Sequence, residues 1–228
     1  MPAMTKALDG LRQMISSGEL AKEQRFPPEP ELCARLGVSR GALREAVRTL
    51  GALGVIEARH GSGTYVSKLD PADIVRNFSL TVDLLPLDGL LQLFEIRRVL
   101  ESHAAALAAA RCTPELSAQL DALITQMESE SDLERAADLD KQFHRLICDT
   151  AGNPTIASLM DVFRSRSSYY NIFEGPDAAT ARATSDAGHR SMAQAITSHD
   201  PVAAANAAGS HVAQTEHWLR KLQGSGEQ

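Results

Sequence analysis

Apolar residues recur at helical spacing along most of the chain. In the first such stretch, which ends at Gly18, they lie three or four positions apart or side by side, at Ala7, Leu8, Leu11, Met14 and Ile15. This periodicity predicts an amphipathic helix. A second, shorter helix is predicted between the proline-flanked Glu29 and Gly37, and a third follows Ser39, a favourable N-cap, and ends before Gly54. The second and third helices therefore meet across a very short turn.

Two short strands are predicted directly after the third helix. Residues 55–58 and 64–66 have strand-like composition, and His60-Gly61-Ser62-Gly63 between them supplies the glycines that a tight hairpin needs. Residues 1–67 thus combine three helices with a two-stranded wing. This arrangement predicts a winged helix-turn-helix domain.

No strand pattern follows residues 68–71, a polar segment marked by proline that we interpret as a linker. Residues 72–222 contain about seven helical stretches, most of them started by a cap residue or a proline. The first is expected over residues 72–84, and the second is a long helix that ends at Ala110. The predicted fold class is mainly α, and residues 223–228 are expected to form a flexible tail.

Composition supports a helical, intracellular protein. The 228 residues suffice for two modest domains, and an aromatic content of only 4% favours helices and excludes an all-β fold. Cys33, Cys112 and Cys148 form no CxxC pair, which argues against a disulfide framework or a cysteine-bound zinc and fits a reducing cytoplasm. No apolar run approaches the roughly 20 residues of a membrane span, so no membrane is expected as a partner.

The distribution of charge matters more than its sum. A net charge of -6 by itself argues against a nucleic-acid partner. However, residues 1–66 hold 9 Lys and Arg against 7 Asp and Glu, whereas residues 67–228 hold 14 against 22. Within the first part, Arg35, Arg40, Arg44 and Arg48 crowd a short helical stretch. The acidity therefore belongs to the second part of the chain.

The first turn of the third predicted helix has the composition of a DNA-reading helix. In a helix-turn-helix the second helix of the motif enters the major groove, and Arg40 and Arg44 share one face from which they can bind guanine edges or phosphates. Arginines that only solubilise a surface helix are the alternative, but the cap, the wing and the charge asymmetry together favour DNA. The candidate DNA-binding residues are Ser39, Arg40, Gly41, Ala42, Arg44 and, at the wing tip, His60 and Gly61.

These candidates belong to a longer series of motifs, which comprises Phe26-Pro27, Glu29, Glu31-Leu32, Leu36-Gly37-Val38-Ser39-Arg40, Leu43-Arg44-Glu45-Ala46, Leu50, Gly54 and Gly61-Ser62-Gly63-Thr64-Tyr65-Val66. In this order the motifs resemble the winged helix-turn-helix of the GntR family of transcription regulators. The resemblance implies double-stranded operator DNA as a partner. Pro30 departs from the family pattern, because it stands where an arginine usually contacts DNA, so one contact is expected to be missing.

A carboxylate and an imidazole share one face of a later predicted helix. Asp140 and His144 are four positions apart, a spacing that lets both reach one metal ion, although such a pair can equally be hydrogen-bonded or solvated. His189 and His211 occur on two further helices with apolar neighbours, so their convergence on the same ion is a hypothesis. Three other histidines match no motif and are interpreted as surface or core residues: His103, His199 and His217.

The second part of the chain carries the pattern Asp140-x-x-Phe143-His144, Gly152-Asn153, His189 and His211, preceded by Glu95-x-Arg97 and Leu100-Glu101. This pattern resembles the FCD ligand-binding domain of the FadR branch of the GntR family. The resemblance implies an antiparallel helical bundle over residues 72–222. It also implies a divalent metal, zinc with nickel or manganese as alternatives, held by Asp140, His144, His189 and His211.

The same resemblance implies an effector that is a small carboxylate or a sugar acid bound beside the metal. Arg97 and Arg166 are the candidate contacts for the acid. One departure is Gly188, directly before His189, where an acidic residue is common in the family.

The leading hypothesis is a metabolite-responsive transcription regulator without enzymatic activity. We expect it to act as a repressor and to bind a pseudo-palindromic operator as a homodimer in the cytoplasm. Two alternatives stay open at this point. One is a metal-dependent hydrolase or lyase that uses the same four candidate ligands, and the other is a constitutive DNA-organising protein.

Overall fold

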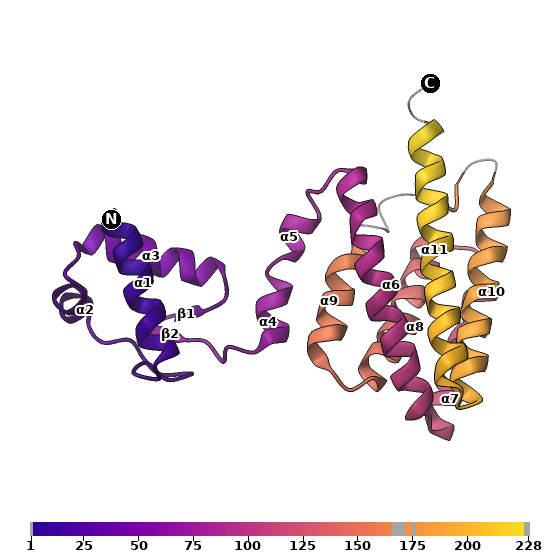
Figure 1. The fold of residues 1–228 in the computed structure, drawn as a ribbon, viewed down its shortest axis with the longest axis horizontal. Helices are drawn as coiled ribbons and strands as arrows, with labels where there is room; N and C mark the ends of the chain where they lie inside the picture. Colours follow the sequence, from indigo (N-terminus) through magenta and orange to yellow (C-terminus); the bar gives the residue numbers. More distant parts are fainter. Residues whose placement is uncertain (1, 166–171, 175–176, 226–228) are drawn as a thin grey trace. The chain divides into compact units, whose positions relative to one another are not determined.

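The computed structural model of the chain describes residues 2–165, 172–174 and 177–225. The chain divides into two compact units, Met1–Asn77 and Phe78–Gln228 (Figure 1). Unit 1 contains a small helical cluster with a hairpin, and unit 2 is helical throughout its described part. The predicted fold class, a winged helix-turn-helix followed by a helical bundle, is confirmed. The predicted boundaries of the linker and the tail stay predictions.

The first five elements of unit 1 are those that the sequence predicts, in the same order. They are α1 (Ala3–Ser16), α2 (Glu29–Leu36), α3 (Arg40–Ala52), β1 (Ile56–Arg59) and β2 (Gly63–Val66), and the unit also contains α4 (Pro71–Arg76). Gly37 ends α2 in the left-handed conformation, with φ of 61°, which glycine adopts without a steric penalty. The side chain of Ser39 caps α3 by accepting a hydrogen bond from the backbone N–H of Ala42 at 3.3 Å. These two residues make the sharp turn between α2 and α3.

The wing is an antiparallel hairpin. Ile56 pairs with Val66 at its base, and Arg59 pairs with Gly63 at its tip, so β1 runs one residue further than the strand predicted over 55–58. Arg25 adds an isolated bridge to Tyr65 on the outer side of β2. Val66 and Ile56 point into the core of unit 1, where they pack with the buried face of α3. The opposite face of α3 is therefore left exposed.

Unit 2 consists of one short helix followed by six long ones in its described part. They are α5 (Ser79–Val82), α6 (Leu87–Ala110), α7 (Pro114–Ser129), α8 (Leu133–Thr150), α9 (Pro154–Ser165), α10 (Ala178–Thr197) and α11 (Pro201–Ser225). The long helices lie roughly side by side in a bundle (Figure 1). Among the described residues, no helix is both long and apolar enough to span a bilayer.

The single helix predicted over residues 72–84 is wrong, because the structure has two short helices there. The backbone N–H of Asn77 bonds to the carbonyl of Ile74 at 3.2 Å, which tightens the last turn of α4 and ends it. Phe78 then precedes α5 and is 52% exposed. Without a continuous buried face to pack on, this stretch does not sustain one helix.

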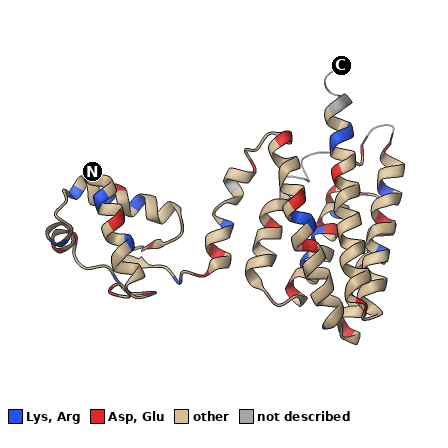
Figure 2. Ribbon diagram, viewed as in Figure 1, with Lys and Arg blue, Asp and Glu red and all other residues tan. Residues whose placement is uncertain are grey.

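Alanine determines how closely the helices of unit 2 pack. Helices α6 and α11 pack together and both contribute small residues to the core: Ala104, Ala105 and Ala108 of α6 and Ala204 and Ala208 of α11 are fully or nearly fully buried. Figure 2 shows the corresponding long stretches of both helices without Lys, Arg, Asp or Glu. Small side chains allow the helix backbones to approach closely. The buried polar side chains of unit 2 therefore lie in a closely packed interior.

Candidate metal centre and DNA interface

Six polar or charged side chains are buried among the described residues, and all six lie in unit 2. They are Arg97 and Glu101 on α6, His144 on α8, Ser158 on α9, His189 on α10 and His211 on α11. Burying a polar group is costly unless it finds a partner. These six side chains therefore mark the candidate site of unit 2.

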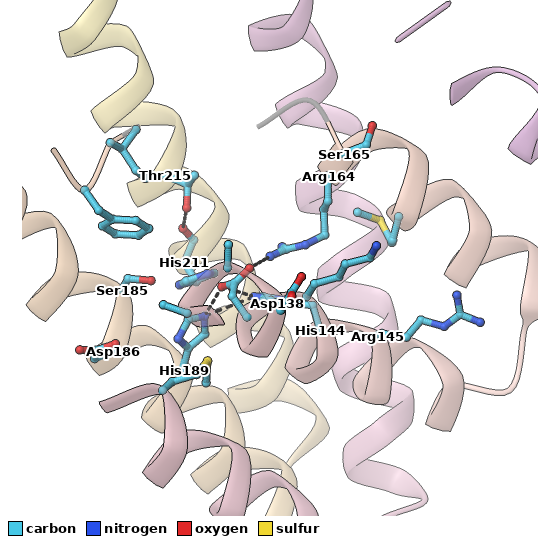
Figure 3. A pocket seen from close by; sticks show the side chains of 18 of the residues that line it. Asp138, His144, Arg145, Arg164, Ser165, Ser185, Asp186, His189, His211 and Thr215 are labelled. Carbon is cyan, nitrogen blue, oxygen red and sulfur yellow. Dashed lines mark hydrogen bonds and ion pairs between the residues drawn. The ribbon is translucent and has the colours of Figure 1, made fainter. Parts of the chain in front are cut away.

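The four predicted metal ligands come together in the interior of the bundle. Asp140, His144, His189 and His211 each offer one ligand atom, and these atoms all lie within 4.8 Å of one another. Figure 3 shows the three histidines gathered at this point. Nε2 of His144 is 3.3 Å from Nε2 of His189, and Oδ1 of Asp140 is 3.1 Å from the latter atom. Helices α8, α10 and α11 thus bring one carboxylate and three imidazoles to a single point.

Glu101 sets the tautomer of His144. Its Oε2 lies 3.1 Å from Nδ1 of His144, so the ring donates from Nδ1 and keeps a lone pair on Nε2, which faces the cluster. Burial, with the nearby charge of Arg164, lowers the pKa of His144 to about 4. Burial and the two neighbouring imidazoles likewise hold the pKa of His211 well below its usual range. Both rings are neutral near pH 7, as metal ligation requires.

The donor set fits a divalent ion. Nδ1 of His189 and Nδ1 of His211 are buried and have no hydrogen-bond partner among the described residues. Three imidazoles and one carboxylate are borderline donors that suit zinc, nickel or manganese. The convergence of one carboxylate and three imidazoles at one buried point is the arrangement that a bound cation would need.

Gly188 explains how His211 reaches the cluster. A Cβ at position 188 would lie 2.6 Å from Nδ1 and 3.3 Å from Cβ of His211, closer than a side chain tolerates. The backbone of α10 therefore lies directly against the imidazole of α11. The sequence departs from the family pattern at position 188, and the structure gives a reason. Only glycine lets the two helices come this close without displacing the ring of His211.

A buried ion pair on α6 supports the cluster from behind. Nε of Arg97 donates to Oε1 of Glu101 at 3.0 Å, and both side chains are almost wholly buried. Burial alone would raise the pKa of Glu101, but the charges of Arg97 and Arg164 outweigh it and hold that pKa well below its usual range. Arg97, predicted to contact an effector, is thus engaged with a carboxylate, although it also lines the cavity described below.

Sequence reasoning did not find Arg164, at the last turn of α9. Its Nη1 lies 3.2 Å from Oε2 of Glu101, and its Nη2 donates to Oδ2 of Asp140. Figure 3 shows Arg164 on the same side of the pocket wall as His144. No local spacing could indicate this contact, because its partners lie 63 and 24 positions earlier in the chain. Arg166, the other predicted effector contact, lies outside the described residues.

A cavity of about 430 Å³ opens beside the cluster. The candidate ligands and Arg164 form part of its wall, and Met127, Leu133, Met160 and Phe173 contribute apolar surface. A pocket of this size with a few converging polar groups accommodates a small organic molecule.

On unit 1, the exposed face of α3 carries three of the predicted DNA contacts, Arg40, Gly41 and Arg44. Ala42 instead faces the core and is only 8% exposed. Nε of Arg44 donates to Oε2 of Glu29, at the start of α2, over 2.9 Å. The exposed face of α3 therefore presents two arginines, one of which is held by the carboxylate of Glu29.

The wing tip presents His60 and Gly61 to solvent, and Gly61 has a φ of 69° that favours glycine. The tip is stiffened from below by Tyr65, whose hydroxyl is 2.6 Å from Oγ of Ser62 and whose ring lies 4.2 Å from the guanidinium of Arg59. A wing of this kind can enter a groove without first becoming ordered.

Comparison with known proteins identifies both parts. The profile described as "Bacterial regulatory proteins, gntR family" matches residues 4–66, and the FCD domain profile matches residues 92–214. The chain belongs to the GntR family. LutR of Bacillus subtilis, an HTH-type transcriptional regulator, is 33% identical over 149 residues, which are 65% of this chain and 68% of LutR.

Two further relatives extend the similarity over nearly the whole GntR protein. The Glc operon transcriptional activator of Escherichia coli K12 is 28% identical, covering 92% of this chain and 86% of the activator. A solved GntR structure from Streptococcus agalactiae superposes with a TM-score of 0.59 at 29% identity, covering 94% of this chain and 99% of that one. The GntR protein is therefore a DNA-binding transcription regulator with an effector domain, and not an enzyme.

Proposed function

We propose that this GntR protein is a metabolite-responsive repressor that acts in the cytoplasm as a homodimer. The observation that carries the proposal is the cluster of Asp140, His144, His189 and His211 on the wall of a 430 Å³ cavity. Operator binding is controlled by a small carboxylate or sugar acid that enters this cavity. The family match supports DNA binding and a small-molecule effector, and the cluster supports the metal.

The four clustered side chains hold the ion, zinc in the first place and nickel or manganese as alternatives. Glu101 orients His144 toward it, and Gly188 lets His211 approach. The bound ion supplies a Lewis-acid centre with open coordination positions that suit a carboxylate oxygen. The apolar wall of the cavity then accommodates the remainder of the acid, and Arg97 and Arg166 remain the contacts that the resemblance implies.

The reading helix is α3. Arg40 and Arg44 contact base edges or phosphates from its exposed face, Gly41 permits close approach, and Ser39 fixes the first turn. His60 and Gly61 contact the minor groove from the wing. A single reading helix covers only a few base pairs, so two copies on a pseudo-palindromic operator are needed for specificity.

Regulation follows from the way the cluster joins helices. The side chains that would hold the ion come from α8, α10 and α11, and Glu101 ties them to α6. An acid that binds one arrangement of these helices better than another shifts the population toward it. A change in half-site spacing between the two DNA-binding units then releases the operator.

The test combines metal content with operator release. His211→Ala is compared with His217→Ala, a matched control on the same helix whose side chain is exposed. The operator is first selected from random duplexes, and effectors are found by thermal shift of zinc-loaded protein against small carboxylates and sugar acids, since a bound ligand raises stability. We expect His211→Ala to lose metal and effector response while it retains operator binding.

His217→Ala should behave as the wild type in each assay. If His211→Ala releases the operator in response to the acid as the wild type does, the metal has no part in sensing. If no acid alters operator binding by the wild type, the constitutive DNA-organising alternative is correct.

A further inference from the structure

Arg164 lies between two carboxylates. One is Asp140, a member of the four-residue cluster, and the other is Glu101, which contacts His144 from behind the cluster. The guanidinium of Arg164 bonds to Glu101 at 3.2 Å and to the carboxylate of Asp140, and its side chain is 15% exposed at the cavity wall. Its partners belong to α6 and α8, whereas it is itself on α9. Arg164 thus joins three helices at the place where a ligand would enter.

The charges of the network around Arg164 are balanced without a metal ion. Arg97 and Arg164 carry two positive charges, and Glu101 and Asp140 carry two negative ones, all within one connected network. A divalent cation added to this network leaves two positive charges without a counter-charge. Because the site is buried, that excess is poorly screened and favours an incoming anion.

Asp140 is shared between two cationic sites. Its Oδ1 faces Nε2 of His189 at 3.1 Å and Nε2 of His144 at 3.7 Å, and its Oδ2 accepts from Arg164. An ion among the imidazoles would draw on the same carboxylate that neutralises the guanidinium. The ion and Arg164 are therefore competitors for one negative charge.

We propose that Arg164 is the counter-ion of Asp140 in the metal-free protein, and that metal binding converts it into the group that attracts the carboxylate of the effector. This inference rests on the proposed metal site. It predicts positive coupling, in which the ion raises affinity for the acid and, by reciprocity, the acid raises affinity for the ion.

Two neighbouring arginines do not meet the same requirements. Arg97 is paired with Glu101 four residues along its own helix and is only 3% exposed. Arg145, at the edge of the cavity, bonds to Asp149 and Asp161 and has no described contact with Asp140. Arg145 is therefore the matched control for Arg164.

The experiment is a calorimetric titration of the metal-free full chain with zinc chloride. Wild type, Arg164→Gln and Arg145→Gln are titrated in 100 mM sodium acetate (about physiological ionic strength) and in sodium chloride of equal ionic strength. Acetate is the probe because it is a minimal carboxylate. In chloride, we expect Arg164→Gln to bind zinc at least about tenfold more tightly than the wild type, because a like charge next to the ion has been removed.

Acetate gives the second readout. It should raise the zinc affinity of the wild type and of Arg145→Gln relative to chloride, and this enhancement should be lost in Arg164→Gln. A purely structural arginine would change the results in the opposite direction, since its loss would weaken zinc binding. Equal or weaker zinc binding by Arg164→Gln overturns the inference, as does an enhancement that survives the substitution.

Arg164→Lys covers the case in which Arg164→Gln fails to fold. It keeps the charge, so its zinc affinity in chloride should stay within about threefold of the wild type. The absence of acetate enhancement in the wild type would overturn the inference without any variant. If the wild type binds no zinc at all, the proposed metal site fails as well, whereas equal binding by wild type and Arg164→Gln refutes only the role of Arg164.

Discussion

The ion pairs described in unit 1 are all at least partly exposed, whereas unit 2 holds a buried network in addition to its exposed pairs. In unit 1, Arg44 and Glu29 form a pair whose side chains are 66% and 30% exposed. In unit 2, Arg97 and Glu101 form a pair whose side chains are 3% and 4% exposed, and it continues into Arg164. Water and dissolved ions compete readily for the charges of the first pair, whereas burial shields the charges of the second pair from both.

This difference fits the role that we propose for each unit. An arginine that must meet a phosphate or a base has to remain available, so a weak, exposed partner can position it without trapping it. A buried network instead sets a charge balance that only a specific cation or anion can alter. The comparison predicts large effects on folding from charges inside the bundle and effects mainly on DNA binding from charges on unit 1.

The largest effect is expected for Glu101→Gln. It leaves Arg97 without its counter-charge and deprives Arg164 of one partner, and breaking a buried pair costs about 3–5 kcal/mol in free energy of unfolding. Urea denaturation measures this loss. Glu29→Gln, the matched change on unit 1, should cost less than about 1 kcal/mol. Similar losses in the two variants would contradict the comparison.

A pH dependence of stability comes next. The pKa of His144 is about 4 in the folded protein against an ordinary value of 6.5, so the unfolded chain takes up the proton first. The stabilisation is complete above pH 6.5 and is lost as the pH falls toward 4, by roughly 3 kcal/mol for this group.

Urea denaturation of metal-free protein between pH 7.5 and 4 measures the effect. The wild type should lose more stability over this range than His144→Gln, which has no proton to gain at this position. Parallel curves for the two proteins would show that His144 is not responsible for the dependence.

Arg40→Ala and Arg44→Ala should affect DNA binding and not folding. Each should cost about 1–3 kcal/mol of operator binding if the guanidinium makes a bidentate base contact. Gel-shift titration on operator and scrambled duplexes gives the value, and thermal melting checks the fold. Arg12→Ala is the control, because Arg12 is on α1 and pairs with Asp9 in the part of the chain that the structure describes. Unchanged operator affinity in both α3 variants would exclude α3 as the reading helix.

The smallest effect is expected for Pro30→Arg. Pro30 is exposed near the start of α2, so an arginine fits there without disturbing the core. One more phosphate contact releases roughly one more counterion, so binding should strengthen and the salt slope should steepen by about 0.9. Operator binding titrated at several salt concentrations measures the slope. An unchanged slope would mean that position 30 does not face the DNA backbone.

Much of the fold could be predicted from local pattern. The helices of unit 1, the Ser39 cap, the Gly37 stop and the hairpin all depend on residues within a few positions of one another. The failure over residues 72–84 has the same origin, since apolar spacing does not reveal whether a continuous surface exists for a helix to pack on.

For the site, the sequence determined the chemistry and the tertiary structure determined the connections. The residue types and the four-residue spacing of Asp140 and His144 indicated a metal ligand pair, and motif resemblance added His189 and His211. Only packing could bring Arg164 to Glu101 and Asp140, or make Gly188 the contact surface for His211. Helical periodicity acts over a few residues, whereas contacts between distant segments depend on how alanine-lined helices close around one core.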